Sequence, residues 1–466
     1  MRITIQATID GVKGQLPRTE TLGTIERDDN WVPASGLGLF LRETHALLRQ
    51  LQSVVLAEQV ARFVERIAHC GQCGCHLATK DSKTIVYRTA FGKARLASLR
   101  LYSRCDCCGT WAARKGSFSP LAEALPERTH PQWLWLQARY AAVMSYRLAQ
   151  SFLRAAFPAG QSLPVSSLKV NTRRVGQRLD AETQVAVDAI VHAPRRMQDP
   201  SPAPSQESAV ALEIDAGYIR AVPKREGVRW IAVVASKLVR PQPQHGYAHA
   251  YAGTYNPHQG ARQQAFLASV GVPPQAPVTV LSDGGDDVAF ACRLPRPTER
   301  VLDWFHIAMR VAQLLTAVRG LRHADETMKT ELARRIEGAK WLLWHGRQER
   351  CLQRLEALRR DTGWAGSRNP LGKLIRYLRS FPDRLINYGK RYHEDRPIST
   401  NSAESAVDYV IGQRMKKKGH MRWSREGANA LLQVRCAVLN GVDVQHFKRW
   451  YPPQRRLFER SQLAAA

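Results

Sequence analysis

The chain has 466 residues, too many for one ordinary hydrophobic core, so we expect two to four domains. Its 69 lysines and arginines exceed its 40 aspartates and glutamates, and the formal net charge is +29. This excess favours a polyanionic partner, with nucleic acid ahead of a ribosome-associated or membrane-surface role. No apolar run reaches the roughly 18 to 20 residues that a membrane span needs, and the start does not resemble a signal peptide. We therefore expect a cytoplasmic, nucleoid-associated protein.

The amino-terminal region, residues 1–68, is expected to hold a strand, a polar connection rich in turns, and one or two helices. The strand is indicated by "MRITIQATI", and the helices by apolar residues that recur every three or four positions after residue 37. Six of the nine cysteines follow between residues 70 and 108. Such crowding favours a metal site over disulfide bonds.

Two Cys-x2-Cys-Gly motifs, "CGQCG" and "CDCCG", flank a segment rich in β-forming residues that suits a hairpin. Each motif aims two thiolates at one point, and four thiolates complete a closed tetrahedral zinc site. We predict a structural zinc ribbon over residues 69–112. The predicted ligands are Cys70, Cys73, Cys105 and Cys108. Four neighbours could replace one of them: His69, Cys75, His76 and Cys107. Reduced cysteines without metal are the alternative.

Residues 118–192 are expected to form a helical DNA-binding domain. One helix runs from Pro131 to Pro158, and a second, short helix begins after the connection "PAGQSLP", as in a helix-turn-helix. On the second helix Leu168, Val175 and Leu179 form an apolar seam. The basic residues that point away from this seam are Lys169, Arg173, Arg174 and Arg178. A helix that docks in a DNA groove needs such a pattern, although solvated surface charge explains it equally well.

Residues 193–208 hold four prolines without apolar periodicity and are predicted to be a linker. Three adjacent β-rich segments follow and suggest an antiparallel meander, then a helix and the apolar run "PVTVLSD". Residues 307–395 are expected to be almost entirely helical.

Three carboxylates stand out in this second half. Asp215 lies within a hydrophobic strand, Asp283 ends another, and Glu404 begins a helix. If they converge, they could hold two Mg²⁺ or Mn²⁺ ions, which prefer oxygen ligands. Each also has a plain structural explanation, as a strand-end residue, an Asp-Gly turn and half of a capping box. Asp286 and Asp287 are close enough to be confused with Asp283.

These carboxylates, together with "LDWFHIAMR", "TNSAES" and "GQRMKKKGHMRWSREGANALLQVR", resemble bacterial insertion-sequence transposases with an RNase H-like DDE domain. The similarity is nearest to the Kra-type group, which is related to the Mutator-like superfamily. It implies that Asp215, Asp283 and Glu404 are the metal-binding triad, and that a helical insertion separates the last two. "DWFH" matches the family's Asp/Cys-x2-His motif. Asp303 could support the triad or replace one of its members, and His306 could simply be a hydrogen-bonded core histidine.

Basic residues that follow Glu404 are expected to bind the DNA backbone beside the cut. They are Arg414, Lys416, Lys417, Lys418 and Arg422. Trp423 could stack on an unpaired end base or pack on the next helix.

The predicted fold is multidomain, mixed α+β and α/β. Its predicted parts are an amino-terminal region (1–68), a zinc ribbon (69–112), a helix-turn-helix domain (118–192), a linker (193–208), an RNase H-like domain in two segments (209–306 and 396–445) around a helical insertion (307–395), and a basic tail (446–466). The predicted function is a DNA transposase that cleaves insertion-sequence ends and joins them to target DNA, as a homodimer or larger assembly. The alternatives are an RNase H-like nuclease or resolvase without strand transfer, and an inactive zinc-containing DNA-binding regulator.

Overall fold

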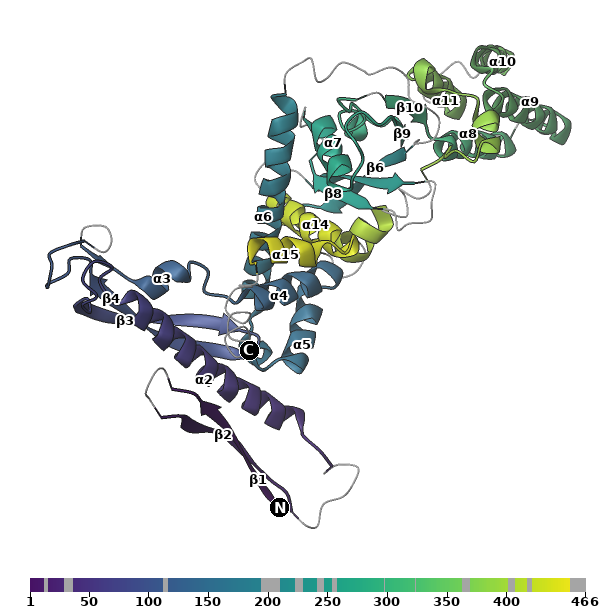
Figure 1. Ribbon diagram of the computed structural model, residues 1–466. Helices are drawn as coiled ribbons and strands as arrows, with labels where there is room; N and C mark the ends of the chain where they lie inside the picture. Colours follow the sequence, from purple (N-terminus) through teal and green to yellow (C-terminus); the bar gives the residue numbers. More distant parts are fainter. Residues whose placement is uncertain are drawn as a thin grey trace. The chain divides into compact units, whose positions relative to one another are not determined.

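The protein is mixed α and β and has more than one domain in a computed structural model (Figure 1). The described residues are 1–11, 16–28, 37–111, 116–193, 210–222, 229–240, 247–253, 258–296, 298–322, 324–362, 369–400, 407–416 and 421–452. The linker beyond residue 193 and the tail beyond residue 452 lie outside them. Two compact units form, Met1–Thr172 with Gln445–Ala466, and Arg173–Val444. Within the described ranges, no helix is both long and apolar enough to cross a membrane.

The first unit begins with an antiparallel hairpin of β1 (Arg2–Ile9) and β2 (Arg18–Glu26). The sequence predicted a polar connection where β2 lies; the three threonines and Ile25 of "RTETLGTIE", which are β-branched, favour a strand instead. A single helix, α2 (Leu41–Ile67), then packs against β2 and β4. The next sheet contains β3 (Thr79–Thr89), β4 (Gly92–Tyr102) and β5 (Ser117–Phe118), all antiparallel, and is followed by α3 (Pro120–Ala124).

Helices follow this sheet, with two differences from the predicted pattern. The first predicted helix is two helices, α4 (Pro131–Val143) and α5 (Tyr146–Ala156), because the Ser145 side chain caps α5 by accepting a hydrogen bond from the Leu148 amide. After the short 3₁₀ helix η1 (Pro158–Ser162) comes α6 (Val165–Val191), which is longer than predicted. The boundary between the two units falls inside α6, after Thr172.

The second unit is built on a five-stranded sheet with the order β10-β9-β6-β7-β8. Its strands are β6 (Val210–Arg220), β7 (Trp230–Val239), β8 (Ala248–Ala252), β9 (Val278–Ser282) and β10 (Thr298–Leu302). Neighbours β6, β7 and β8 are antiparallel, whereas β9 is parallel to both β6 and β10. Helix α7 (Gln259–Ser269) covers the face that presents Leu212 and Ile214, with Phe266 buried against them.

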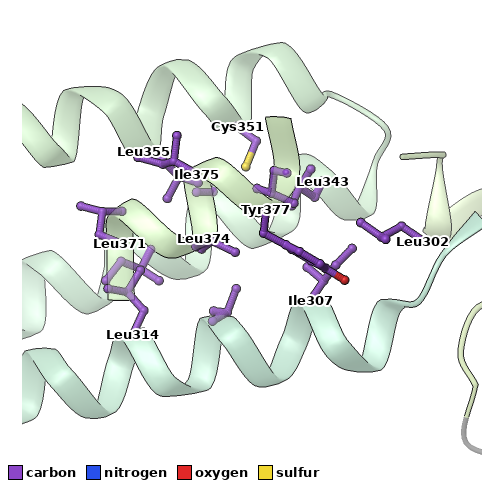
Figure 2. Packing of buried hydrophobic residues seen from close by; sticks show 14 of the residues in the cluster. Leu302, Ile307, Leu314, Leu343, Cys351, Leu355, Leu371, Leu374, Ile375 and Tyr377 are labelled. Carbon is purple, nitrogen blue, oxygen red and sulfur yellow. The ribbon is translucent and has the colours of Figure 1, made fainter. Parts of the chain in front are cut away.

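A helical region packs on the other face of the sheet. It contains α8 (Trp304–Arg319), α9 (Glu326–Trp344), α10 (Gln348–Asp361), α11 (Pro370–Arg379), η5 (Pro382–Arg384) and α12 (Tyr388–His393). Figure 2 shows its interior, where side chains such as Leu314, Leu355 and Leu374 meet. The same core includes Leu281 and Leu302, so the helices and the sheet share one hydrophobic interior. Between residues 304 and 400 the described chain contains no strand.

The chain returns to the sheet through η6 (Asp408–Lys416), a π-helix, followed by α14 (Arg425–Leu439) and α15 (Asp443–Trp450). Helices α14 and α6 touch at Gly176, where an added Cβ would lie 2.0 Å from the main-chain oxygen of Ala430. Only glycine permits this approach between two backbones.

Gly176→Ala is therefore expected to lower the free energy of unfolding by about 1–3 kcal/mol or more, because one helix has to move away from the other. Urea unfolding followed by circular dichroism measures the change. Gly338→Ala is the matched control within α9, because its added Cβ would meet only the movable Arg354 side chain. Equal stabilities of the two variants would contradict the inferred contact.

Candidate functional site

The four predicted zinc ligands lie together, with all their sulfur atoms within 4.8 Å of one another. The sulfurs of Cys70 and Cys108 are 3.7 Å apart, and those of Cys73 and Cys105 are 3.5 Å apart. Tetrahedral zinc with Zn–S bonds of about 2.3 Å separates its sulfurs by about 3.8 Å. The cluster could therefore hold a structural zinc ion.

Two turns of the same construction, residues 70–74 and 105–109, present these sulfurs. In each, the glycine amide donates to the carbonyl oxygen of the first cysteine at 2.9 Å. Gly74 and Gly109 have φ of 71° and 70°, the left-handed region that favours glycine. Hydrogen bonds with Thr110 lower the pKa of Cys108 to about 6, which favours the thiolate that binds metal. The alternative ligands His69, Cys75, His76 and Cys107 are not members of the cluster.

A row of aspartates lies at one end of the parallel strands in the second unit. Ile214 on β6 is the register partner of Ser282 on β9, and Ser282 is the partner of Leu302 on β10. Each of these three residues is followed in the chain by an aspartate: Asp215, Asp283 and Asp303. Neighbouring strands are about 4.8 Å apart, and register partners point to the same face. We call these three residues the aspartate row.

Asp303 is the enclosed member of the row, with no exposed surface. Its carboxylate accepts hydrogen bonds from the Phe305 amide, from the Thr400 amide and hydroxyl, and from the ring of His306. Burial acts to raise the pKa of Asp303, but the hydrogen bonds from His306 and Thr400 hold it below the ordinary value. Both oxygens are therefore occupied by protein donors, which suits a positioning role better than metal binding.

His306 connects Asp303 to the other two carboxylates. The hydrogen bond to Asp303 raises the pKa of His306, and the negative charges of Asp283 and Asp215 act in the same direction. The half-buried imidazole thus lies within the field of all three aspartates and favours its protonated form.

The turn after β9 fixes Asp283. Its carboxylate accepts the Gly285 amide at 2.8 Å, and its main-chain oxygen accepts the Tyr377 hydroxyl at 2.8 Å. Gly284 adopts φ of +77°, and an added Cβ there would lie 2.6 Å from the Phe381 ring. Helix α11 and the residues after it therefore position this turn. Asp283 and Asp215 are both partly exposed, so a ligand can reach them.

Glu404, the third predicted triad member, lies outside the described residues, as do Lys417 and Lys418. The residues on either side of that segment contact the site. Thr400 bonds to Asp303, and Val407 is 3.1 Å from where a Cβ on Gly217 would lie. Gly217 is two residues beyond Asp215, on the same face of β6. Among the described residues, the four cysteines are the one group of three or more metal-ligating side chains close enough to share an ion.

The predicted DNA-contacting residues divide into exposed and buried ones. On α6 the seam of Leu168, Val175 and Leu179 is buried. The exposed basic residues are Lys169, Arg173, Arg174, Arg178, Lys416 and Arg422.

The predicted DNA contacts of Arg414 and Trp423 do not agree with the burial of these side chains. They are only 2% and 8% exposed, and the Arg414 guanidinium lies over the Trp423 ring. Trp423 is held by backbone hydrogen bonds with Arg220, the last residue of β6, and with Val222 just beyond it, and its indole N–H donates to the Met415 carbonyl. Other residues of the protein cover the Trp423 ring, so it packs internally and does not offer a face for base stacking.

Sequence reasoning missed the contacts that organise the aspartate row. Thr400 lies 97 residues from Asp303, and Tyr377 lies 94 residues from Asp283. No local pattern marks either residue. Thr400 is the first residue of "TNSAES", which was its only signal, and Tyr377 lies in neither that motif nor "LDWFH".

The chain matches no protein-family model, and a search of curated proteins gives no match either.

Proposed function

We propose that this protein is a DNA transposase whose catalytic domain is RNase H-like and depends on divalent metal. The observation that supports the proposal is that Asp215 and Asp283 each follow a member of the register pair Ile214–Ser282, at the end of the parallel pairing of β6 and β9. A pair of neighbouring carboxylates on one face costs free energy through mutual repulsion unless a cation balances it. Such a pair is typical of a metal-binding site.

The strand order supports the choice of fold. The sequence predicts a β-β-β-α-β pattern here, and β6, β7, β8, α7 and β9 follow one another in that order. Both carboxylates come from the central part of the sheet, where β6 and β9 pair. The helical region between Asp303 and Thr400 agrees with the expected insertion ahead of Glu404.

The donor atoms fit Mg²⁺ or Mn²⁺, which prefer carboxylate oxygens. Asp215 and Asp283 would hold the metal together with Glu404, and Asp303 would orient His306 and the Thr400 end of the segment that carries Glu404. Two bound ions would activate the attacking oxygen and stabilise the leaving oxygen of a phosphodiester. The chain contributes the carboxylates, with the Asp283 main chain held by Tyr377 and Asp303 held by Thr400.

The surrounding charge favours DNA as the substrate. The net charge of +29 and the exposed basic side of α6 suit binding to the phosphate backbone. Lys416 places its ammonium near Gly217, 3.4 Å from the position of an added Cβ, on the face that carries Asp215. Double-stranded DNA of the element ends and of the target would be the partner. Bringing two ends together requires a homodimer or larger assembly.

The proposal is tested by incubating the purified protein with DNA from both ends of its element and Mg²⁺, then mapping the cut positions. A transposase is expected to cut at the element boundary and to join the freed 3′-hydroxyl to a target duplex. Cutting of DNA without joining, even when a precut end is supplied, would indicate a nuclease or resolvase. Binding without any cutting, and affinity for zinc but not Mn²⁺, would indicate a regulator.

A further inference from the structure

Arg310 lies one helical turn beyond His306 on α8, so both side chains project from the same side of that helix. Its guanidinium carbon is 4.0 Å from the centroid of the Tyr377 ring. The hydroxyl of Tyr377 in turn donates to the main-chain oxygen of Asp283. Figure 2 shows Tyr377 reaching from α11 toward the start of α8, beside Ile307. Two contacts thus tie Arg310 to the turn that holds Asp283.

The charge of Arg310 faces the side chain of Tyr377 and is not neutralised by a carboxylate in the described part of the protein. No carboxylate among the described residues lies within ion-pair distance of its guanidinium, although Arg391, in the same helical region, is paired with Glu299. The contact with Tyr377 orients the guanidinium and engages part of its hydrogen-bonding capacity. A guanidinium carries several N–H donors, so donors remain for a second partner. Arg310 is only partly exposed, so it is held in place at the edge of the site.

We propose that Arg310 binds a backbone phosphate of the DNA strand that enters the pocket of Asp215 and Asp283. This inference rests on the proposed function and adds to it the residue that positions the substrate. A guanidinium can bind two phosphate oxygens through parallel hydrogen bonds, which fixes both distance and orientation. Arg310 places a permanent positive charge beside the turn that carries Asp283. A phosphate can therefore approach carboxylates that would otherwise repel it.

The alternative is that Arg310 only packs on Tyr377. The variant Arg310→Met separates the two roles, because methionine can keep the contact with the ring while it lacks the charge. Arg319→Met is the matched control, since Arg319 is an exposed arginine in the last turn of the same helix. Thermal unfolding of both variants verifies that each is folded.

The first measurement is the affinity of the full chain for element-end DNA in EDTA, at several salt concentrations. For Arg310→Met we expect the slope of log K against log[salt] to become shallower by about 0.9, the loss of one phosphate contact. Arg319→Met is expected to keep the slope of the wild type. An unchanged slope for Arg310→Met, or the same change in both variants, would overturn the proposal.

The second measurement locates the phosphate. Single phosphates along the element end are replaced by uncharged methylphosphonate, and binding is compared between the wild type and Arg310→Met. One substitution is expected to weaken the wild type but to have no further effect on the variant, as in a double-mutant cycle. Strictly additive losses at every position would refute the contact.

The two proposals can fail separately. If the wild type cleaves element ends but Arg310→Met shows no coupling to any phosphate, the Arg310 inference is wrong and the transposase proposal stands. If coupling is found although the wild type never cleaves DNA, Arg310 binds phosphate and the catalytic proposal is wrong.

Discussion

Asp215→Asn is expected to abolish Mg²⁺-dependent cleavage of element ends while end binding stays close to that of the wild type. The amide keeps the size and the hydrogen-bonding capacity of the side chain but removes the charge that would hold a divalent cation. We expect the cleavage rate to fall by at least about 10³-fold, which corresponds to about 4 kcal/mol in the activation barrier. Single-turnover cleavage and a gel-shift assay measure the two properties, and Mn²⁺ binding should weaken in parallel.

The control is chosen from the acidic loop that follows β9. Asp286 is exposed and lies three residues beyond Asp283, outside the aspartate row. Asp286→Asn is therefore expected to cleave at nearly the wild-type rate, whereas Asp283→Asn should behave like Asp215→Asn. Cleavage retained by Asp215→Asn would rule out the proposed metal site. An equal loss in Asp286→Asn would indicate a general effect of acidic charge.

The sequence singled out Asp215 and Asp283 but could not show that they lie near each other. Asp215 and Asp283 each stand out because an acidic residue interrupts or ends an apolar run. Their proximity depends on β9 pairing with β6 in parallel, across more than sixty residues of chain. Strand order is a property of the whole sheet, because the hydrophobic pattern of one strand does not specify its neighbours.

Strand β10 was not predicted, for a related reason. "TERVL" is short, contains two charged residues, and buries only its last two side chains. It lies at the edge of the sheet, where one side of the strand needs no partner. Without β10, Asp303 could be placed only by its motif. Its position in the aspartate row, and its bond to Thr400, follow from tertiary structure alone.

The sequence does not show which basic side chains after residue 407 are exposed and which are buried. Arg414 and Lys416 are two residues apart, yet one is buried and the other exposed. The difference arises because η6 packs on β6 and because Trp423 pairs with the same strand. A cationic side chain beside a tryptophan suggests nucleic-acid binding in a sequence, but here these two side chains stack on each other.

Removal of zinc is expected to unfold the region around the two cysteine turns. The hydrophobic cluster that joins the turns to the adjoining sheet contains only five buried side chains: Ala68, Cys70, Leu77, Leu101 and Cys105. Two of the five are themselves ligands, so little apolar packing remains to hold the turns when the metal is lost. Structural zinc contributes about 10–16 kcal/mol of apparent binding free energy in small zinc-finger peptides. A substantial part of that stabilisation should be lost here.

Cys105→Ser is expected to lower the zinc content from one ion per chain to nearly none and to reduce the melting temperature of the first unit. Metal analysis and thermal unfolding, with and without a chelator, measure both effects. Cys75→Ser is the matched control, because Cys75 follows a cysteine turn but is not a member of the four-sulfur cluster. It should retain zinc. A chain that binds no zinc, or that melts at the same temperature with and without chelator, would show that these sulfurs gather through packing alone. The similarity of the two turns would then need another cause, since a shared ion requires equivalent ligand geometry on both sides whereas apolar packing does not.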